Sequence, residues 1–201
     1  NNVQSREFAI TEDVYSIDGI DVYSNPSVTR LGTGSFTDGS DGFMMMTYYE
    51  IEQTTDVAGL EIMLDSYLFG SPLSAPGGEI IISLRDTAEV FAETFNPSAT
   101  LVESDFYMVT QDDIDDGSLE IAFDSPYSLS PGAYYACVEM YSNNNDADIW
   151  ILDDETVPQP AGASVIFIPG DQVYTNGTAV GIRMKLGNGQ GFDIEETVLN
   201  G

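Results

Sequence analysis

Residues 129–141 read LSPGAYYACVEMY and hold the longest run of strand-forming residues in the chain. Pro131 and Gly132 favour a turn, because proline presets φ and glycine accepts left-handed backbone. Side chains alternate between the two faces of a strand, so the more apolar even-numbered residues 134–140 are expected to face the core. A pair of tyrosines opens the strand. At such a corner a tyrosine can bury its ring and return its hydroxyl to the backbone of the preceding loop.

Short runs with a two-residue period recur along the rest of the chain, each bounded by Gly, Pro, Asn, Asp or Ser. They cover residues 42–51, 60–65, 79–84, 105–110, 118–123, 134–141, 148–152, 164–168 and 179–186. The best helix candidate is a single turn over residues 111–116 that ends at Gly117. The pattern predicts an all-β protein, a two-sheet antiparallel β-sandwich of jelly-roll or Ig-like type.

A length of 201 residues suits one large β domain. We expect a single β-sandwich domain over residues 7–187, an N-terminal tail over residues 1–6 and a C-terminal linker over residues 188–201. No run of about 18 apolar residues is present, so no helix is expected to insert into a membrane.

The charge balance is strongly acidic, with 34 Asp and Glu residues against five Lys and Arg residues and a net charge of −29. Nucleic-acid binding needs a basic surface, which five scattered cations do not make. Anionic lipid surfaces are excluded for the same reason. An acidic surface suits salty water, where charge repulsion is screened, and it suits divalent cations.

Catalysis is not expected. The chain has no histidine and one cysteine, Cys137, so no intrachain disulfide forms and no imidazole base activates the thiol. Glu50 and Glu52 share one strand face at a spacing that suits glycoside hydrolysis. However, such pairs arise by chance among so many acids, and the Glu-x-Asp-x-x-Glu signature of jelly-roll glucanases is missing.

Calcium is the cofactor that the acidic loops favour, because it takes six to eight oxygen ligands and needs no histidine. Three loops are candidates, and each also suits an ordinary solvated turn. Their candidate ligands are Asn144, Asp146 and Asp148 in the first loop, Asp38 and Asp41 in the second, and Asp112, Asp113, Asp115 and Asp116 in the third.

Aromatic residues suggest a second kind of site. The rings of Trp150, Tyr135 and Tyr141, with Tyr48 and Tyr49, are candidates for a platform on which sugar rings stack. The alternative is that most of these rings pack in the core.

The C-terminal stretch carries a family resemblance. It runs through IRMKLG at 182–187, FDIEE at 192–196 and LNG at 199–201. It resembles the end of an accessory β-sandwich module just upstream of the C-terminal sorting domain of type IX secretion substrates, and the chain stops before that domain's Tyr-Pro-Asn-Pro motif. The resemblance implies a protein exported across an outer membrane and then secreted or held at the cell surface.

These observations favour a non-catalytic accessory or adhesive module of a secreted or cell-surface multidomain protein, stabilised by calcium. The alternative is a carbohydrate-binding module attached to a polysaccharide-degrading enzyme. The expected partners are a glycan or a cell-surface protein, together with neighbouring domains of the same polypeptide.

Overall fold

The computed structural model describes residues 11–22, 27–36, 41–66, 70–92, 94–156 and 158–187. Its strands are β1 (Val14–Tyr15), β2 (Val28–Gly32), β3 (Phe43–Ile51), β4 (Thr55–Met63), β5 (Glu79–Asp86), β6 (Val102–Glu103), β7 (Tyr107–Met108), β8 (Ser118–Leu129), β9 (Gly132–Tyr141), β10 (Trp150–Asp154), β11 (Ser164–Phe167), β12 (Val173–Thr175), β13 (Ala179–Val180) and β14 (Ile182–Leu186). The helices are short: η1 (Thr33–Ser35), α1 (Thr87–Val90) and α2 (Gln111–Asp116). No described helix is long and apolar enough to cross a membrane.

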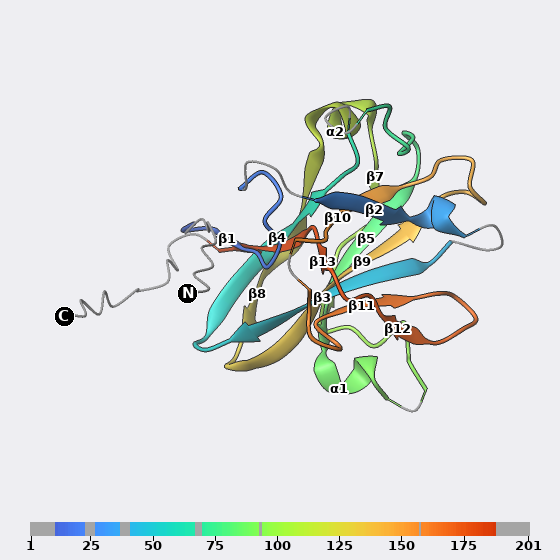
Figure 1. Ribbon diagram of the computed structural model, residues 1–201. Helices are drawn as coiled ribbons and strands as arrows, with labels where there is room; N and C mark the ends of the chain where they lie inside the picture. The colour runs from blue at the N-terminus through green and yellow to red at the C-terminus, as the bar shows by residue number, and fades with distance from the viewer. Residues whose placement is uncertain are drawn as a thin grey trace, which may run out of the picture.

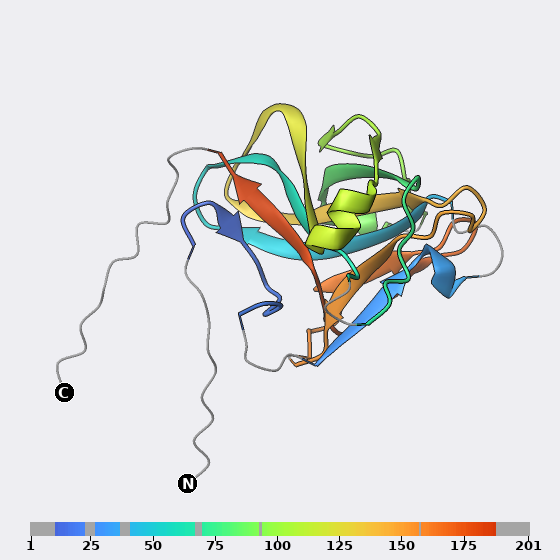
Figure 2. The ribbon, with the colours of Figure 1, turned by 90° about the horizontal axis from the view of Figure 1, so that it is seen from above.

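The strands form a sandwich-like arrangement of antiparallel sheets. One layer is a seven-stranded sheet in the order β12-β11-β3-β9-β5-β6, with β7 also paired to β5. The facing strands form a four-stranded sheet, β1-β14-β4-β8, and a three-stranded sheet, β13-β10-β2. A bridge between Leu64 and Ile151 connects these two smaller sheets. The first and last described strands, β1 and β14, lie side by side (Figures 1 and 2). The helices α1 and α2 lie at opposite ends of the molecule in Figure 1. The predicted fold class is confirmed.

The main core lies between the layers and contains residues from all three sheets. As predicted, Ala136, Val138 and Met140 of β9 face it and are fully buried. Met63 interrupts the alternation of β4 because its side chain belongs to a small separate cluster with Ile20 and Leu152. The apparent break in the sequence pattern therefore marks a residue that is buried on the other face of its strand.

The outer face of the seven-stranded sheet carries a second apolar cluster. Its members are Met44, Met46, Val90, Tyr135, Cys137, Val165 and Phe167. Val90 belongs to α1 and Phe95 follows it, so this helix and the chain after it cover part of the outer face. The central strands β3 and β9 are therefore buried on both faces here, which explains the unbroken run Met44-Met45-Met46.

A buried arginine holds this cover in place. Arg85 of β5 is 1% exposed. Its guanidinium donates hydrogen bonds to the carbonyl oxygens of Pro97 (2.7 Å), Ala99 (3.2 Å) and Asn96 (3.5 Å). It also lies 5.6 Å from the centre of the Phe95 ring. These partners lie within residues 95–99, a few residues after α1, and we call α1 together with residues 95–99 the covering segment. Arg85 therefore attaches the covering segment to the sheet.

Two local predictions are confirmed. The Tyr134 hydroxyl donates to the carbonyl oxygen of Ser130 at 3.0 Å, which is the expected tyrosine corner. α2 spans residues 111–116 and ends at Gly117, whose φ of 77° is in the left-handed region. Its first turn is closed by a capping box between Thr110 and Asp113.

Four short strands, β1, β2, β6 and β12, were not predicted. In β2 the alternation is interrupted by Arg30, whose guanidinium reaches the buried carboxylate of Asp65 at 2.7 Å. The predicted strand over residues 179–186 is divided at Gly181, where an added Cβ would lie 2.7 Å from the Cβ of Met63. Gly181 lies where β13 of one small sheet gives way to β14 of the other. The close contact is with β4, which is far away in the sequence, so the division could not be predicted from residues 179–186 alone.

Candidate functional site

The part of the outer face that α1 does not cover carries an exposed apolar surface. The large hydrophobic residues that are exposed in the described part of the chain are Leu73, Phe91, Leu101, Phe106 and Met108, and three of them fall within residues 101–108. Phe106 is 58% exposed and Met108 is 59% exposed. Such a concentration of exposed apolar side chains is typical of an interaction site.

Strand register places these side chains beside two residues of β9. Glu79 of β5 lies opposite both Met108 and Tyr141, and Ile81 lies opposite Glu139. The Phe106 ring centre is 5.5 Å from that of Tyr141, with the rings tilted by 59°. We call this surface the Phe106 patch; it comprises Glu79, Ile81, Phe106, Met108, Glu139 and Tyr141.

The Glu139 carboxylate has a fixed position within the patch, because the Tyr141 hydroxyl donates a hydrogen bond to its Oε1. Burial raises the pKa of Glu139. The hydrogen bond from Tyr141 and the charge of Arg85 act in the opposite direction, and Glu103 adds to the increase. The pKa of Tyr141 is raised by burial and then by its bond to Glu139. The patch therefore combines an oriented hydrogen-bond acceptor with exposed aromatic surface, a pairing typical of ligand sites.

No described basic side chain is free to attract an anion to the patch. Arg30 pairs with Asp65 at 2.7 Å, Arg183 pairs with Asp18 at 2.6 Å, and Lys185 pairs with Glu120 at 2.8 Å. Arg85 is buried. The negative charge of the patch comes from carboxylates, and the buried Arg85 is the described cation whose charge acts on Glu139.

The predicted aromatic platform is not a single surface. Tyr135 and Tyr49 are each 1% exposed. The Tyr135 hydroxyl donates to the Gly162 carbonyl, and burial raises its pKa to about 12. Tyr49 donates to the Ile182 carbonyl at 2.6 Å. Trp150 lies on β10 in the other layer, so among the predicted ligand-binding residues Tyr141 alone belongs to the Phe106 patch.

Sequence reasoning missed Phe106, Met108 and Glu139 as site residues. A signal was present, because residues 106–109 are apolar at every position, which is typical of a strand buried on both faces. Val109 is buried and Tyr107 is partly buried against the core. The outward residues Phe106 and Met108 lie next to the edge of the sheet with nothing from the described chain over them. An apolar residue that faces outward at a sheet edge marks a candidate binding surface.

Two of the acidic loops come together. The Asp41 carboxylate accepts hydrogen bonds from the Ser142 amide (2.6 Å), the Ser142 hydroxyl (3.1 Å) and the Asn144 amide (3.2 Å). Asp148 accepts from Thr33 and Asn145, both at 2.9 Å. Asp146 is exposed, and Asp38 lies outside the described residues. These carboxylates hold a turn in which three consecutive asparagines, 143–145, have positive φ.

The acids of α2 have mainly structural partners. Asp113 caps the helix and accepts from the Tyr107 hydroxyl at 3.0 Å, and Asp115 accepts from Gln111 at 2.8 Å. Asp112 and Asp116 are exposed. Within the described ranges, no group of three or more His, Cys, Asp or Glu side chains is placed to hold a metal ion. Calcium binding stays a prediction.

The calcium prediction has a direct thermal test. Extracellular modules bind calcium with a Kd of roughly 10⁻⁴ to 10⁻³ M. A concentration ten times the Kd should then stabilise the fold by about 1.4 kcal/mol. Melting in millimolar calcium should occur at a higher midpoint than melting in chelator, and Asp41→Asn should reduce the difference. Equal midpoints, or an equal rise with sodium, would contradict the prediction, since sodium acts by screening.

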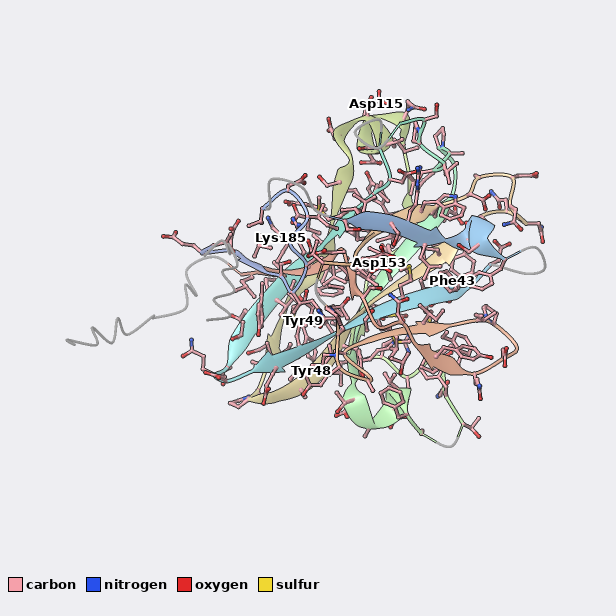
Figure 3. All side chains as sticks on the ribbon, viewed as in Figure 1. Phe43, Tyr48, Tyr49, Asp115, Asp153 and Lys185 are labelled. Carbon is pink, nitrogen blue, oxygen red and sulfur yellow. The ribbon has the colours of Figure 1, made fainter. Side chains whose placement is uncertain are left out.

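A buried polar cluster lies inside the sandwich, around Asp153 of β10 (Figure 3). One carboxylate oxygen of Asp153 accepts hydrogen bonds from Thr178 at 2.6 Å and Asn176 at 3.0 Å. The other oxygen is buried and has no hydrogen-bond partner. Burial raises the pKa of Asp153, while these two hydrogen bonds oppose the shift. The ionised carboxylate is therefore a source of instability in the folded state.

Asp153→Asn should change how stability depends on pH. A raised folded-state pKa means that the stability contributed by this group is complete below the ordinary carboxyl pKa of about 3.9. It is lost as the pH rises through the folded-state pKa. The parent should therefore lose stability between about pH 4 and pH 7, so the free energy of unfolding of Asp153→Asn, measured with urea, should increase relative to that of the parent over this range. Asp124→Asn, at an exposed position, should show no such trend. A parallel trend for both variants would contradict the assignment.

Comparisons with known proteins find a similar fold in solved structures only. No protein-family model matches the chain, and no curated protein matches it. Among solved structures, the clostridial cysteine protease Cwp84 after propeptide cleavage matches with a TM-score of 0.51 and 11% identity, covering 78% of this chain and 36% of that chain. A second structure holds the cysteine protease and lectin-like domains of Cwp84, a surface layer associated protein of Clostridium difficile; it matches with a TM-score of 0.47 and 11% identity, covering 73% and 32%.

The chain thus spans about a third of the length of the solved chains that it matches. At this identity the likeness concerns the fold alone. The class that these findings define is a mostly β, sandwich-like module, similar in fold to part of Cwp84.

Proposed function

We propose that this chain is a non-catalytic accessory or adhesive module of a secreted or cell-surface multidomain protein, and that it binds its ligand through the Phe106 patch. The observation that carries the proposal is the exposure of Phe106 and Met108 beside the oriented Glu139–Tyr141 pair. A lone exposed apolar residue needs no explanation, but a cluster of them around a fixed acceptor is typical of recognition.

The absence of a catalytic role is part of this proposal and rests on the residues available. The chain contains no histidine. Cys137 is fully buried, and burial raises the pKa of its thiol, which disfavours the thiolate that a nucleophile needs. Glu50 and Glu52 are exposed at the end of β3. The export inferred from the C-terminal resemblance and the acidic composition both support a location outside the cell.

A carbohydrate is the ligand class that the patch favours. Exposed aromatic rings offer flat apolar faces to the C–H faces of sugar rings, and adjacent carboxylates accept hydrogen bonds from hydroxyl groups. Glu79, opposite Tyr141 and Met108, and Glu139, opposite Ile81, supply such carboxylates. Carbohydrate binding and adhesion are compatible, because a module that holds a surface glycan also attaches the protein that carries it.

The proposal is tested by measuring retention of the chain on a panel of immobilised polysaccharides, with the parent compared to Phe106→Ala. Central aromatic residues of binding sites commonly contribute about 2 kcal/mol or more, so affinity should fall at least tenfold. Phe91→Ala is the matched control, because Phe91 is 55% exposed but lies beyond α1, against Tyr135. It should bind like the parent.

Three outcomes would overturn the proposal. They are equal binding by Phe106→Ala and the parent, retention on none of the polysaccharides, and turnover of a polysaccharide that is lost in Glu50→Gln or Glu52→Gln. Circular dichroism of each variant would show that it remains folded.

A further inference from the structure

We propose that the Phe106 patch selects glycans that carry free amino groups, so that a protonated amino sugar lies against Phe106 with its ammonium group among the surrounding carboxylates. This inference rests on the proposed function and specifies the ligand of the same site. It is carried by the charge distribution around the patch.

Three strands of the same sheet bring carboxylates to the part of it that carries Tyr141. Glu79 lies on β5 opposite Tyr141, Glu139 lies on β9, and Glu103 lies on β6 opposite Ser83. Glu103 is close enough for its charge to act on both Glu139 and Tyr141, and Asp41 acts on Tyr141 as well. Four acidic side chains therefore direct a negative potential at one aromatic surface.

The positive charges that would balance these acids are used elsewhere. Arg85 acts on Glu139 through its charge, but its guanidinium is buried beneath the covering segment. The other described cations, Arg30, Arg183 and Lys185, are held in ion pairs in other sheets of the molecule. An anionic sugar such as a uronate would meet repulsion here, whereas an ammonium group would meet attraction from carboxylates and from the aromatic faces.

The backbone beside the patch favours a sugar over a cationic peptide. An extended peptide binds a sheet by adding a strand to a free edge. The outer edge of β5 is already occupied: the Ile82 amide donates to the Ser104 hydroxyl at 3.1 Å, and the Ile82 carbonyl accepts from the Ser104 amide at 2.9 Å. β6 and β7 pair with the rest of that edge and are themselves the last strands of the sheet, so an added peptide strand could not reach β5 or β9, which carry most of the patch. The patch thus offers side-chain acceptors and ring faces, which suit the hydroxyl groups, amines and apolar faces of an amino sugar.

The test compares short soluble oligomers that share one backbone. A β-1,4-linked glucosamine hexamer, its fully N-acetylated counterpart and a β-1,4-linked glucuronate hexamer are titrated calorimetrically into the intact chain. Titration at about pH 6 keeps an ordinary amine protonated. Salt at about 0.15 M shortens non-specific attraction to roughly 8 Å. We expect saturable one-to-one binding of the glucosamine hexamer, at least tenfold tighter than that of the acetylated hexamer, and no binding of the uronate.

Variants separate the patch from the general acidity of the chain. Glu139→Gln and Glu50→Gln each remove one negative charge, but Glu50 lies exposed at the end of β3, away from the patch. Glu139→Gln should weaken binding at least tenfold and Glu50→Gln less than twofold. Phe106→Ala should weaken it as much as Glu139→Gln does without any change in charge. Equal losses in the two glutamine variants would show diffuse attraction of a polycation and overturn the inference.

The remaining outcomes separate this inference from the proposed function. Equal affinity for the acetylated and amino hexamers, with Phe106→Ala weakening both, would overturn amino-group selection and leave glycan binding in place. If the glucosamine hexamer fails to bind while another polysaccharide is retained through Phe106, amino-group selection is likewise overturned and glycan binding stands. A lysine hexamer that binds through Phe106 more tightly than the sugar would identify a cationic peptide as the ligand and overturn the inference.

Discussion

Replacement of Arg85 by methionine is expected to lower the free energy of unfolding by at least about 3 kcal/mol. Its guanidinium is the charged donor for three backbone carbonyls of residues 96–99. Methionine keeps most of the length of the side chain but has no group that donates a hydrogen bond. Hydrogen bonds to a charged donor contribute about 1.5–3 kcal/mol each, and the two shorter ones, to Pro97 and Ala99, account for the expected loss. Urea unfolding followed by tryptophan fluorescence would measure the loss.

The same variant should expose Cys137 to a thiol reagent. Cys137 is fully buried in the second apolar cluster, under the segment that Arg85 ties down. If that segment opens in Arg85→Met, the thiol should react faster under native conditions than it does in the parent. Lys185→Met is the control, because it removes a half-buried cation whose ion pairs, to exposed carboxylates, are worth about 0–1 kcal/mol. A loss in Arg85→Met no larger than in Lys185→Met, with unchanged thiol reactivity, would show that the arginine does not hold the cover.

The fold class was predictable because alternation reports directly on a strand with one buried face. β3, β5 and β9 were found almost to their ends from this pattern. The connection at Pro131, just before β9 begins at Gly132, and the end of α2 at Gly117 were also predicted, because their signals lie in adjacent residues. These features depend on interactions within a few positions of one another along the chain.

The parts that were missed depend on contacts between distant segments. Nothing near Tyr135 in the sequence indicates that α1 covers it, so a buried ring was counted as a candidate for sugar stacking. The role of Arg85 depends on carbonyl groups more than ten residues away. The Phe106 patch combines β5, β9 and the segment before β7, and its two rings are brought together only by strand pairing.

Gly59→Ala is expected to be the most damaging single-methyl addition that can be made to β4. The backbone of β8 passes so close to this residue that an added Cβ would lie 2.1 Å from the carbonyl oxygen of Ile121 and 2.8 Å from the Cα of Ala122. These are backbone atoms, so no side chain can turn aside to relieve the clash. The register of β4 against β8 already shifts between Val57 and Gly59. We therefore expect β4 and β8 to separate locally.

Because β4 and β8 form much of the layer opposite the seven-stranded sheet, the cost of that separation should exceed about 3 kcal/mol, the upper end for ordinary overpacking. Gly132→Ala adds the same methyl group where the nearest atom is the movable Tyr134 hydroxyl at 3.2 Å, and it should cost less than about 1 kcal/mol. Urea unfolding of the two variants would compare them, with soluble yield as the readout if Gly59→Ala fails to fold. Equal stability of the two variants would mean that the backbones of β4 and β8 do not approach closely at Gly59.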